Sequence, residues 1–208
     1  FQLARCLRDE DLRADRQPEH TQIDIEMAFP TEETIFTLIE GLMSHVFREV
    51  LSVDIPTPFP RLTYREAMNR FGSDKPDTRF GLEMTDVTEY GRVSEFQVMR
   101  GVAEAGGAVM GLRVPGGAAM SRKDVMDLEG AAKTYGAKGL AWTKVGTDGF
   151  EGGVAKFLDA PTFTRALSAE PGDMLLFVAD NRRDTACKSL GAVRTVLGAP
   201  LIAGREKE

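Results

Sequence analysis

The chain has 208 residues, of which 42% are hydrophobic and 28% are charged, and this globular composition argues against disorder along its whole length. The formal net charge of −6 argues against indiscriminate nucleic-acid binding, because proteins that track phosphates usually have a basic excess. Two cysteines far apart in the sequence, Cys6 and Cys187, and two histidines argue against a structural zinc site.

The first element that the sequence predicts is an antiparallel hairpin. Residues 1–8 are short and apolar-rich, and residues 21–29 alternate strictly between apolar and polar side chains, which is typical of strands. Period two places Gln22, Asp24 and Glu26 on one face of the second strand. Arg8, at the end of the first strand, can project over the same face. We expect the other face to lie on a core and this one to be open.

Two helices are predicted next. Residues 32–51 carry apolar side chains at helical spacing after a plausible N-cap, Thr31, and two glutamates follow in the first turn. Residues 63–66 form a capping-box pattern that opens a short helix ending near Gly72. We expect the apolar stripe of the long helix to be core; it consists of Ile35, Leu38, Ile39, Leu42, Met43, Val46 and Val50.

A second, compact α+β module is predicted from about residue 84, where glycine becomes frequent. The capping pair Ser121 and Asp124 opens one of its helices, and the glycine runs are interpreted as turns because no phosphate-binding loop motif is present. No apolar run approaches the roughly eighteen residues of a membrane helix. We expect strands near 96–102, 108–114, 138–145, 154–158 and 174–179, and helices near 122–135, 161–169 and 185–198.

The open face of the hairpin combines groups suited to different ligands. A guanidinium such as that of Arg8 grips carboxylates and phosphates, whereas a carboxylate such as that of Asp24 suits an ammonium. One surface could therefore hold an amino acid and a phosphate together. The alternative is that the charged segment only neutralises itself, through exposed pairs of about 0–1 kcal/mol each. Its arginines are Arg5, Arg8, Arg13 and Arg16, and its acids include Asp9, Glu10, Asp11, Asp15 and Glu19.

The stretch FQLARCLRDEDLRADRQPEHTQIDIEMAF resembles motif 2 of class II aminoacyl-tRNA synthetases, in the version of bacterial aspartyl-tRNA synthetases, with Arg8, Asp9 and Glu10 as its Arg–x–Glu core. FPRLTYREAMNRFGSDKPDTRFGLE is similar to the segment that follows in that family. SRKDVMDLE, KGLAW and GGVAKFL resemble its inserted GAD domain, which an amidotransferase subunit shares. The resemblance implies an α+β fold with part of the catalytic core in residues 1–83, a GAD-like insertion in 84–187 and a return segment in 188–208.

The resemblance also implies a reaction: ATP-dependent activation of L-aspartate to aspartyl-adenylate, then transfer to tRNA(Asp). Arg8 would be the catalytic residue, bridging the ATP α-phosphate and the aspartate carboxyl group. Asp24 would bind the aspartate ammonium, and Glu26 would support it from behind. The other expected contacts are Asp9, Glu10, Gln17 and His20 with ATP, where His20 replaces a more usual Phe, and Glu10, Arg13 and Arg16 with the tRNA acceptor end.

The same family has parts that these 208 residues do not contain, namely motifs 1 and 3 and the anticodon-binding barrel. We therefore expect a longer parent chain, a cytoplasmic homodimer that uses ATP with phosphate-bound Mg²⁺, and no adenylate formation by this polypeptide alone. No metal ligands are predicted, and whether the parent also charges tRNA(Asn) is left open. The alternatives are a non-catalytic GAD module that binds tRNA or a protein, and an asparagine or lysine synthetase, from which GSDKPD and the GAD-like insertion point away.

Overall fold

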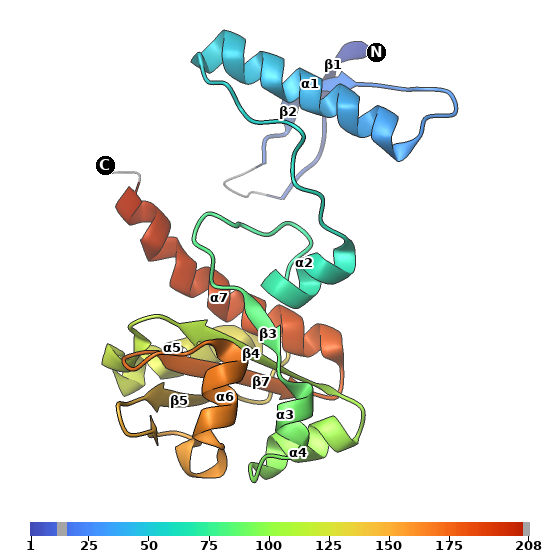
Figure 1. Cartoon of the computed structure of the whole chain (residues 1–208). Coiled ribbons are helices and arrows are strands. Elements are labelled where there is room, and N and C mark those ends of the chain that lie inside the picture. Colours follow the sequence, from blue (N-terminus) through green and yellow to red (C-terminus); the bar gives the residue numbers. More distant parts are fainter. Residues whose placement is uncertain (12–15, 206–208) are drawn as a thin grey trace. The chain divides into compact units, whose positions relative to one another are not determined.

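The computed structural model describes residues 1–11 and 16–205, which form two compact units, Phe1–Arg61 and Leu62–Glu208 (Figure 1). The described residues contain two antiparallel sheets and seven α-helices, which confirms the predicted α+β fold class. The compact units divide between Arg61 and Leu62. The predicted family domains, with boundaries after residues 83 and 187, stay a prediction.

The first unit contains the expected hairpin, with strand β1 at Gln2–Leu7 and strand β2 at Glu19–Asp24. Strand β2 begins and ends earlier than the alternating pattern suggested. Its last pair joins Asp24 to Gln2, and residues 25–29 are outside the ladder. The expected core face is wrong for this unit, since Leu3, Leu7 and Ile23 are all more than half exposed.

Helix α1 spans Glu32–Leu51, as predicted, and the hydroxyl of Thr31 accepts the N–H of Thr34 at 3.2 Å. The expectation that its apolar stripe is core is wrong within this unit: Ile35 is 36% exposed and Val50 is 73% exposed. Amphipathic spacing identifies the apolar side of a helix but not what covers it. In the unit as described, one helix and a two-stranded sheet do not enclose this side.

The connector after α1 is held by a charged residue of the helix. Glu40 is buried, accepts the backbone N–H of Phe59 at 2.9 Å and forms a salt bridge with Arg61. The Arg61 hydrogen bond is the main reason that the pKa of Glu40 lies below its usual value. The guanidinium of Arg61 also lies 4.2 Å from the centre of the Phe36 ring.

The second unit is built on an antiparallel five-stranded sheet in the order β3-β4-β7-β5-β6 (Figure 1). Its strands are β3 Met84–Asp86, β4 Ala108–Val114, β5 Ala141–Val145, β6 Phe150–Glu151 and β7 Met174–Asp180. Side chains alternate between two separate cores, so that Leu176 and Val178 lie on one side and Leu175 and Phe177 on the other.

Helices cover both faces of this sheet. One core includes residues of α5, Arg122–Thr134, and α7, Arg183–Arg205; the other includes residues of α3, Thr88–Arg92, α4, Gln97–Glu104, and α6, Ala160–Leu167. Short 3₁₀ turns occur at η1, Gly117–Ala119, and η2, Ala155–Phe157. The capping box of Ser121 and Asp124 is confirmed at the start of α5.

Two predicted strands are wrong. Residues 96–102 belong mainly to α4. Met99 and Ala103 are buried while Gly101 between them is exposed, which fits a helix, whereas a strand would place all three on one face. Residues 154–158 contain η2 rather than a strand. Short apolar runs carry too few residues for periodicity to separate the two states.

Helix α2, Tyr64–Phe71, has the predicted capping box and ends at Gly72 in a left-handed conformation, with φ of 71°. At this point the chain crosses α7 at Gly191. A Cβ atom on Gly191 would lie 2.8 Å from the Cα of Gly72, closer than side chains tolerate. The two glycines therefore allow backbone-to-backbone contact between segments that are far apart in the sequence.

Helix α7 corrects the expectation about membrane segments. Its part Arg183–Ala203 is long and apolar enough, by length and mean hydropathy, to span a membrane, but 44% of that stretch is buried inside the unit. Ala186, Leu190 and Val193 belong to the core on the α5 side of the sheet. This packing accounts for the apolar composition of the helix.

Candidate functional site

The register of the hairpin decides which side chains share a face. Residues directly opposite each other in an antiparallel ladder point to the same side. Gln2 is opposite Asp24, and Ala4 is opposite Gln22. The backbone N–H of Arg8 donates to the carbonyl of Pro18 at 2.8 Å, which continues the pairing one residue beyond β1. Period two therefore places Arg8 and Asp24 on the same face.

Arg8 is exposed, and among the described residues its guanidinium has no ion-pair partner. The other described arginines of this region behave differently. Arg5 pairs with Glu19 on the opposite face, and Arg16 donates to Glu10 at 2.6 Å. The self-neutralising alternative thus describes Arg5 and Arg16 but not Arg8.

Asp24 lies at the other end of the face. Its carboxylate accepts the side-chain amide of Gln2 at 3.3 Å, and a shallow hollow is lined by Phe1, Gln2, Asp24 and Glu26. Asp24 is opposite Gln2, and Arg8 is six positions from Gln2 along the first strand, which is roughly 20 Å. One ligand that reaches both groups must be elongated.

The remaining predicted contacts are spread along the hairpin. Asp9 and Gln17 are exposed in the connection, and His20 is half-buried opposite Cys6, on the face that carries Arg8. Glu26 is exposed after the end of β2. Arg13 lies outside the described residues. The structure therefore brings Arg8, His20 and Asp24 onto one face, while Glu10 is held by Arg16.

Sequence reasoning missed two features of this unit. Phe1 and Gln2 line the hollow beside Asp24, which only the strand register reveals. Glu40 of α1 holds the connector after the helix through Phe59 and Arg61. A single charged residue beside the apolar stripe was the one sequence feature that could have indicated this role.

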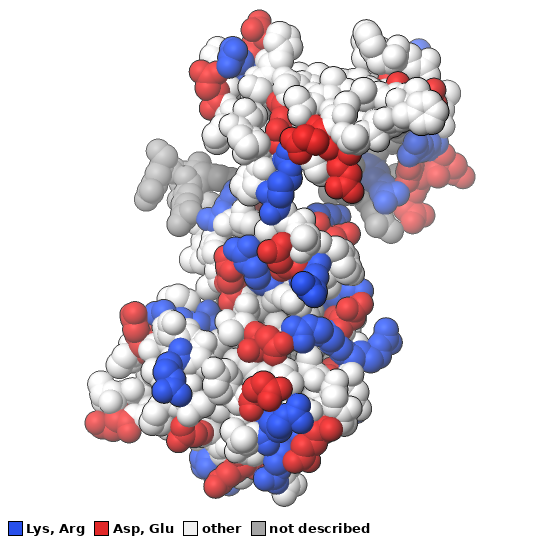
Figure 2. All heavy atoms as spheres, turned by 45° about the vertical axis from the view of Figure 1, so that its right-hand side comes forward, with Lys and Arg blue, Asp and Glu red and all other residues white. Residues whose placement is uncertain are grey.

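The second unit shows no single-sign surface on the face in Figure 2, where basic and acidic side chains are interspersed. Metal ligands are a separate question. Within residues 1–11 and 16–205, no group of three or more His, Cys, Asp or Glu side chains is arranged to hold a metal ion. A pocket lies in this unit, between α4 and the end of β7. It contains none of the predicted site residues.

Comparison with known proteins bears on the whole chain. The family described as tRNA synthetases class II (D, K and N) matches residues 1–186. Aspartate–tRNA ligase of Bacillus licheniformis is 52% identical over 97% of this chain and 34% of its own length. Aspartate–tRNA ligase of Exiguobacterium sibiricum is 52% identical, and aspartate–tRNA(Asp/Asn) ligase of Bacillus cytotoxicus is 51% identical, each over 97% of this chain and 35% of the relative.

The chain thus spans about a third of the length of these curated relatives. The family match covers both the hairpin with its exposed arginine and most of the second unit. On this basis the chain belongs to the class II tRNA synthetases of the aspartate, lysine and asparagine group.

Proposed function

We propose that the chain is part of an aspartate–tRNA ligase, in which the hairpin contributes one wall of the site for ATP and L-aspartate. The observation that carries this proposal is the exposed guanidinium of Arg8, without an ion-pair partner among the described residues, on the same face as Asp24. The identity of 50–52% to aspartate–tRNA ligases supports aspartate over asparagine or lysine as the substrate.

The proposed reaction has two steps. The aspartate carboxylate attacks the α-phosphorus of ATP, the bond to the β-phosphate oxygen breaks, and pyrophosphate leaves. A ribose hydroxyl at the end of tRNA(Asp) then takes the aspartyl group and releases AMP. Negative charge builds on the α-phosphate in the first step, and a guanidinium beside it stabilises that charge without any covalent enzyme intermediate.

Each side chain of the shared face has a role in this proposal. Arg8 is proposed to contact the α-phosphate and the aspartate carboxyl group, and Asp24 the aspartate ammonium group. The last two groups belong to one small amino acid, whereas the strand positions of Arg8 and Asp24 are roughly 20 Å apart, so the described hairpin does not hold both side chains against one aspartate. His20, between them on this face, is proposed to stack on adenine. Bound Mg²⁺ would neutralise the ATP phosphates.

Side chains of the connection between the two strands are proposed to contact ATP and the acceptor end of the tRNA. Asp9 and Gln17 are exposed there and are proposed to contact ATP. Arg16, now paired with Glu10, would exchange that partner for tRNA, since an exposed pair of this kind contributes only about 0–1 kcal/mol. We propose Arg13 as a second contact to the acceptor stem and Glu26 as a support for Asp24.

The test uses ATP–pyrophosphate exchange in a full-length ligase that contains this chain. Arg8→Ala is expected to lower the exchange rate about 10²–10³-fold, the size found when one charge-stabilising donor is removed. Arg5→Ala is the matched control, because Arg5 lies on the opposite face of the same strand and pairs with Glu19. Equal losses in the two variants would contradict the proposed face.

The 208-residue chain by itself is expected to show no exchange. It covers about a third of the relatives' length, and the apolar side of α1 is not enclosed by its own unit. Turnover by the isolated chain would overturn this expectation. A cytoplasmic, homodimeric parent and tRNA(Asn) as a further substrate are also proposed, the latter because one relative is named as an Asp/Asn ligase.

The alternative function is a non-catalytic binding module in the second unit. The mixed charges in Figure 2 favour a protein over tRNA as its ligand. The pocket between α4 and β7 is the observation that supports this alternative, and it can coexist with the ligase function.

A further inference from the structure

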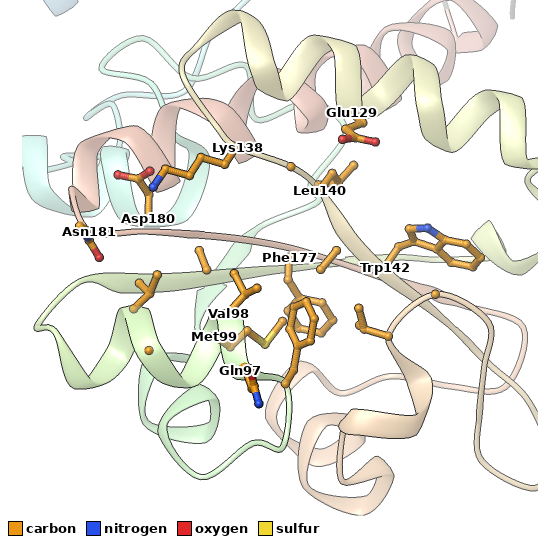
Figure 3. Close-up of a pocket in the computed structure, with 18 of the residues that line it drawn as sticks. Gln97, Val98, Met99, Glu129, Lys138, Leu140, Trp142, Phe177, Asp180 and Asn181 are labelled. Carbon is orange, nitrogen blue, oxygen red and sulfur yellow. The ribbon is translucent and has the colours of Figure 1, made fainter.

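The pairing between β5 and β7 stops before the end of β7. Ala141 is opposite Phe177 in the last pair of that ladder, whereas β4 stays paired with β7 as far as Asp180. The chain before β5, residues 138–140, is not a strand and diverges from β7 (Figure 3). The last three residues of β7 therefore have a strand neighbour on one side only.

Hydrogen-bond alternation identifies the residue that faces this gap. In an antiparallel ladder, every second residue points both its N–H and its C=O to the same neighbour. Val145 donates its N–H to the carbonyl of Asp173 at 2.8 Å, so Asp173, Phe177 and Ala179 point their backbone groups toward the β5 side. Within the described part of the chain, no backbone hydrogen bond joins Ala179 to residues 138–140. Ala179 thus offers an N–H and a C=O to an incoming chain.

A pocket of about 710 Å³ opens at the same place. Phe177 and Ala179 of β7 line it, and Figure 3 shows Val98 and Met99 of α4 beside Phe177. Trp142 lies toward the end of the pocket that is farther from Lys138 and Asp180. The Phe177 ring packs in an edge-to-face arrangement against the ring of Phe163, with 5.5 Å between the ring centroids. The volume falls within the usual range for ligand pockets, roughly 300–1,000 Å³.

The polar side chains of the pocket are concentrated at one end. Figure 3 shows Lys138, Asp180 and Asn181 together there, beside the open part of β7, while Glu129 and Gln97 lie apart from them among the apolar lining residues. A ligand therefore meets charges of both signs and an amide at one end and mostly apolar walls elsewhere. This arrangement suits a peptide, whose polar backbone and flanking side chains accompany one apolar side chain.

We propose that this pocket binds an extended peptide segment of a partner protein. One peptide residue pairs its backbone with Ala179, and its apolar, preferably aromatic, side chain enters the space between α4 and Phe177. The geometry is consistent, because residues opposite each other in a ladder point to the same face, and Ala179 faces the α4 side. A helical ligand would not satisfy Ala179, since its internal backbone groups are already paired.

The binding test uses the complete chain and the fluorescence of Trp142, which is its single tryptophan and lines the pocket. The probe is the peptide acetyl-Ser-Phe-Ser-amide. One analogue replaces Phe with Ala, and another carries a methyl group on the Phe nitrogen, which removes the donor without changing the side chain. We expect saturable binding of the probe at about 1 mM or tighter. Each analogue is expected to bind about tenfold more weakly.

Two results would overturn the proposal. Absence of saturable binding of the probe excludes the site, and equal affinity for the N-methyl analogue excludes strand pairing. Val98→Asp is expected to abolish binding; Val98 is 56% exposed, and an acid in the first turn of a helix is tolerated. Met126→Asp, 69% exposed on α5 and outside the pocket, is the control and should bind normally. Equal loss in both variants would also overturn the proposal.

Discussion

Arg194 is buried in α7 at 1% exposure and joins three backbone carbonyls that precede β3. Its guanidinium donates to the carbonyls of Leu82 at 2.9 Å, Asp77 at 2.6 Å and Gly81 at 2.7 Å. Burial lowers its pKa, although an arginine stays charged at neutral pH. We predict that Arg194→Met destabilises the second unit strongly, because the loop loses every one of these donors.

The magnitude follows from the groups left behind. An orphaned buried carbonyl costs about 1–3 kcal/mol, and three that share one donor do not add fully, so we expect a loss of about 3–5 kcal/mol. The lost stacking on Phe71 and Phe80, whose ring centres lie 4.8 Å and 4.4 Å away, acts in the same direction. Arg194→Lys should lose less, since an ammonium keeps the charge but not the planar fork.

Urea unfolding followed by Trp142 fluorescence measures this effect, because the single tryptophan lies in the second unit. Lys188→Met is the matched control on the same helix. Lys188 is exposed, with Asp184 3.9 Å away, and its loss should change stability by less than about 0.5 kcal/mol. A loss below about 1 kcal/mol for Arg194→Met would refute the reasoning.

Two further predictions concern the same unit and the same urea assay. Gly191→Ala should destabilise the unit by about 1–3 kcal/mol, because the new Cβ would lie 2.8 Å from both Gly72 and the carbonyl of Phe71. Gly130→Ala, in open space on α5, is the control and should stabilise the unit by about 0.5–1 kcal/mol. The reverse order of stabilities would contradict the close crossing of Gly72 and Gly191. Asp173→Asn should cost about 2–4 kcal/mol, because this buried carboxylate accepts the N–H groups of Glu170 and Gly116 and pairs with Arg113. Burial raises the pKa of Asp173, but these three donors together lower it below the usual value. The native carboxylate therefore stabilises the fold above about pH 4, and this contribution is lost as the pH falls further. Between about pH 5 and 3, Asp173→Asn should lose less stability than the unmodified chain does. An equal loss in both proteins would contradict this assignment.

Local chemistry made the helix starts predictable. Thr31, Thr63 and Ser121 each cap the helix that the sequence assigned to them, because a side-chain oxygen and the N–H groups that it accepts lie within three residues. The short apolar run around Met99 could not be assigned in this way. Its helical state depends on burial against a sheet whose strands come from later in the chain.

The hairpin site was predictable in part for the same reason. Period two placed Arg8 and Asp24 on one face, and the register agrees. The pairing of Arg16 with Glu10 and the position of Gln2 beside Asp24 depend on how the strands align, which composition does not contain. The gap beside Ala179 arises because two strands of unequal length meet, and no local pattern announces such a mismatch.

The crossing of Gly72 and Gly191 also closes a long loop of the chain inside the second unit. The backbone at these two positions is within contact distance, so the intervening residues, 73–190, begin and end at the same place. Chain ends that lie close together are the condition under which a segment can be inserted into a protein without separating the parts on either side of it.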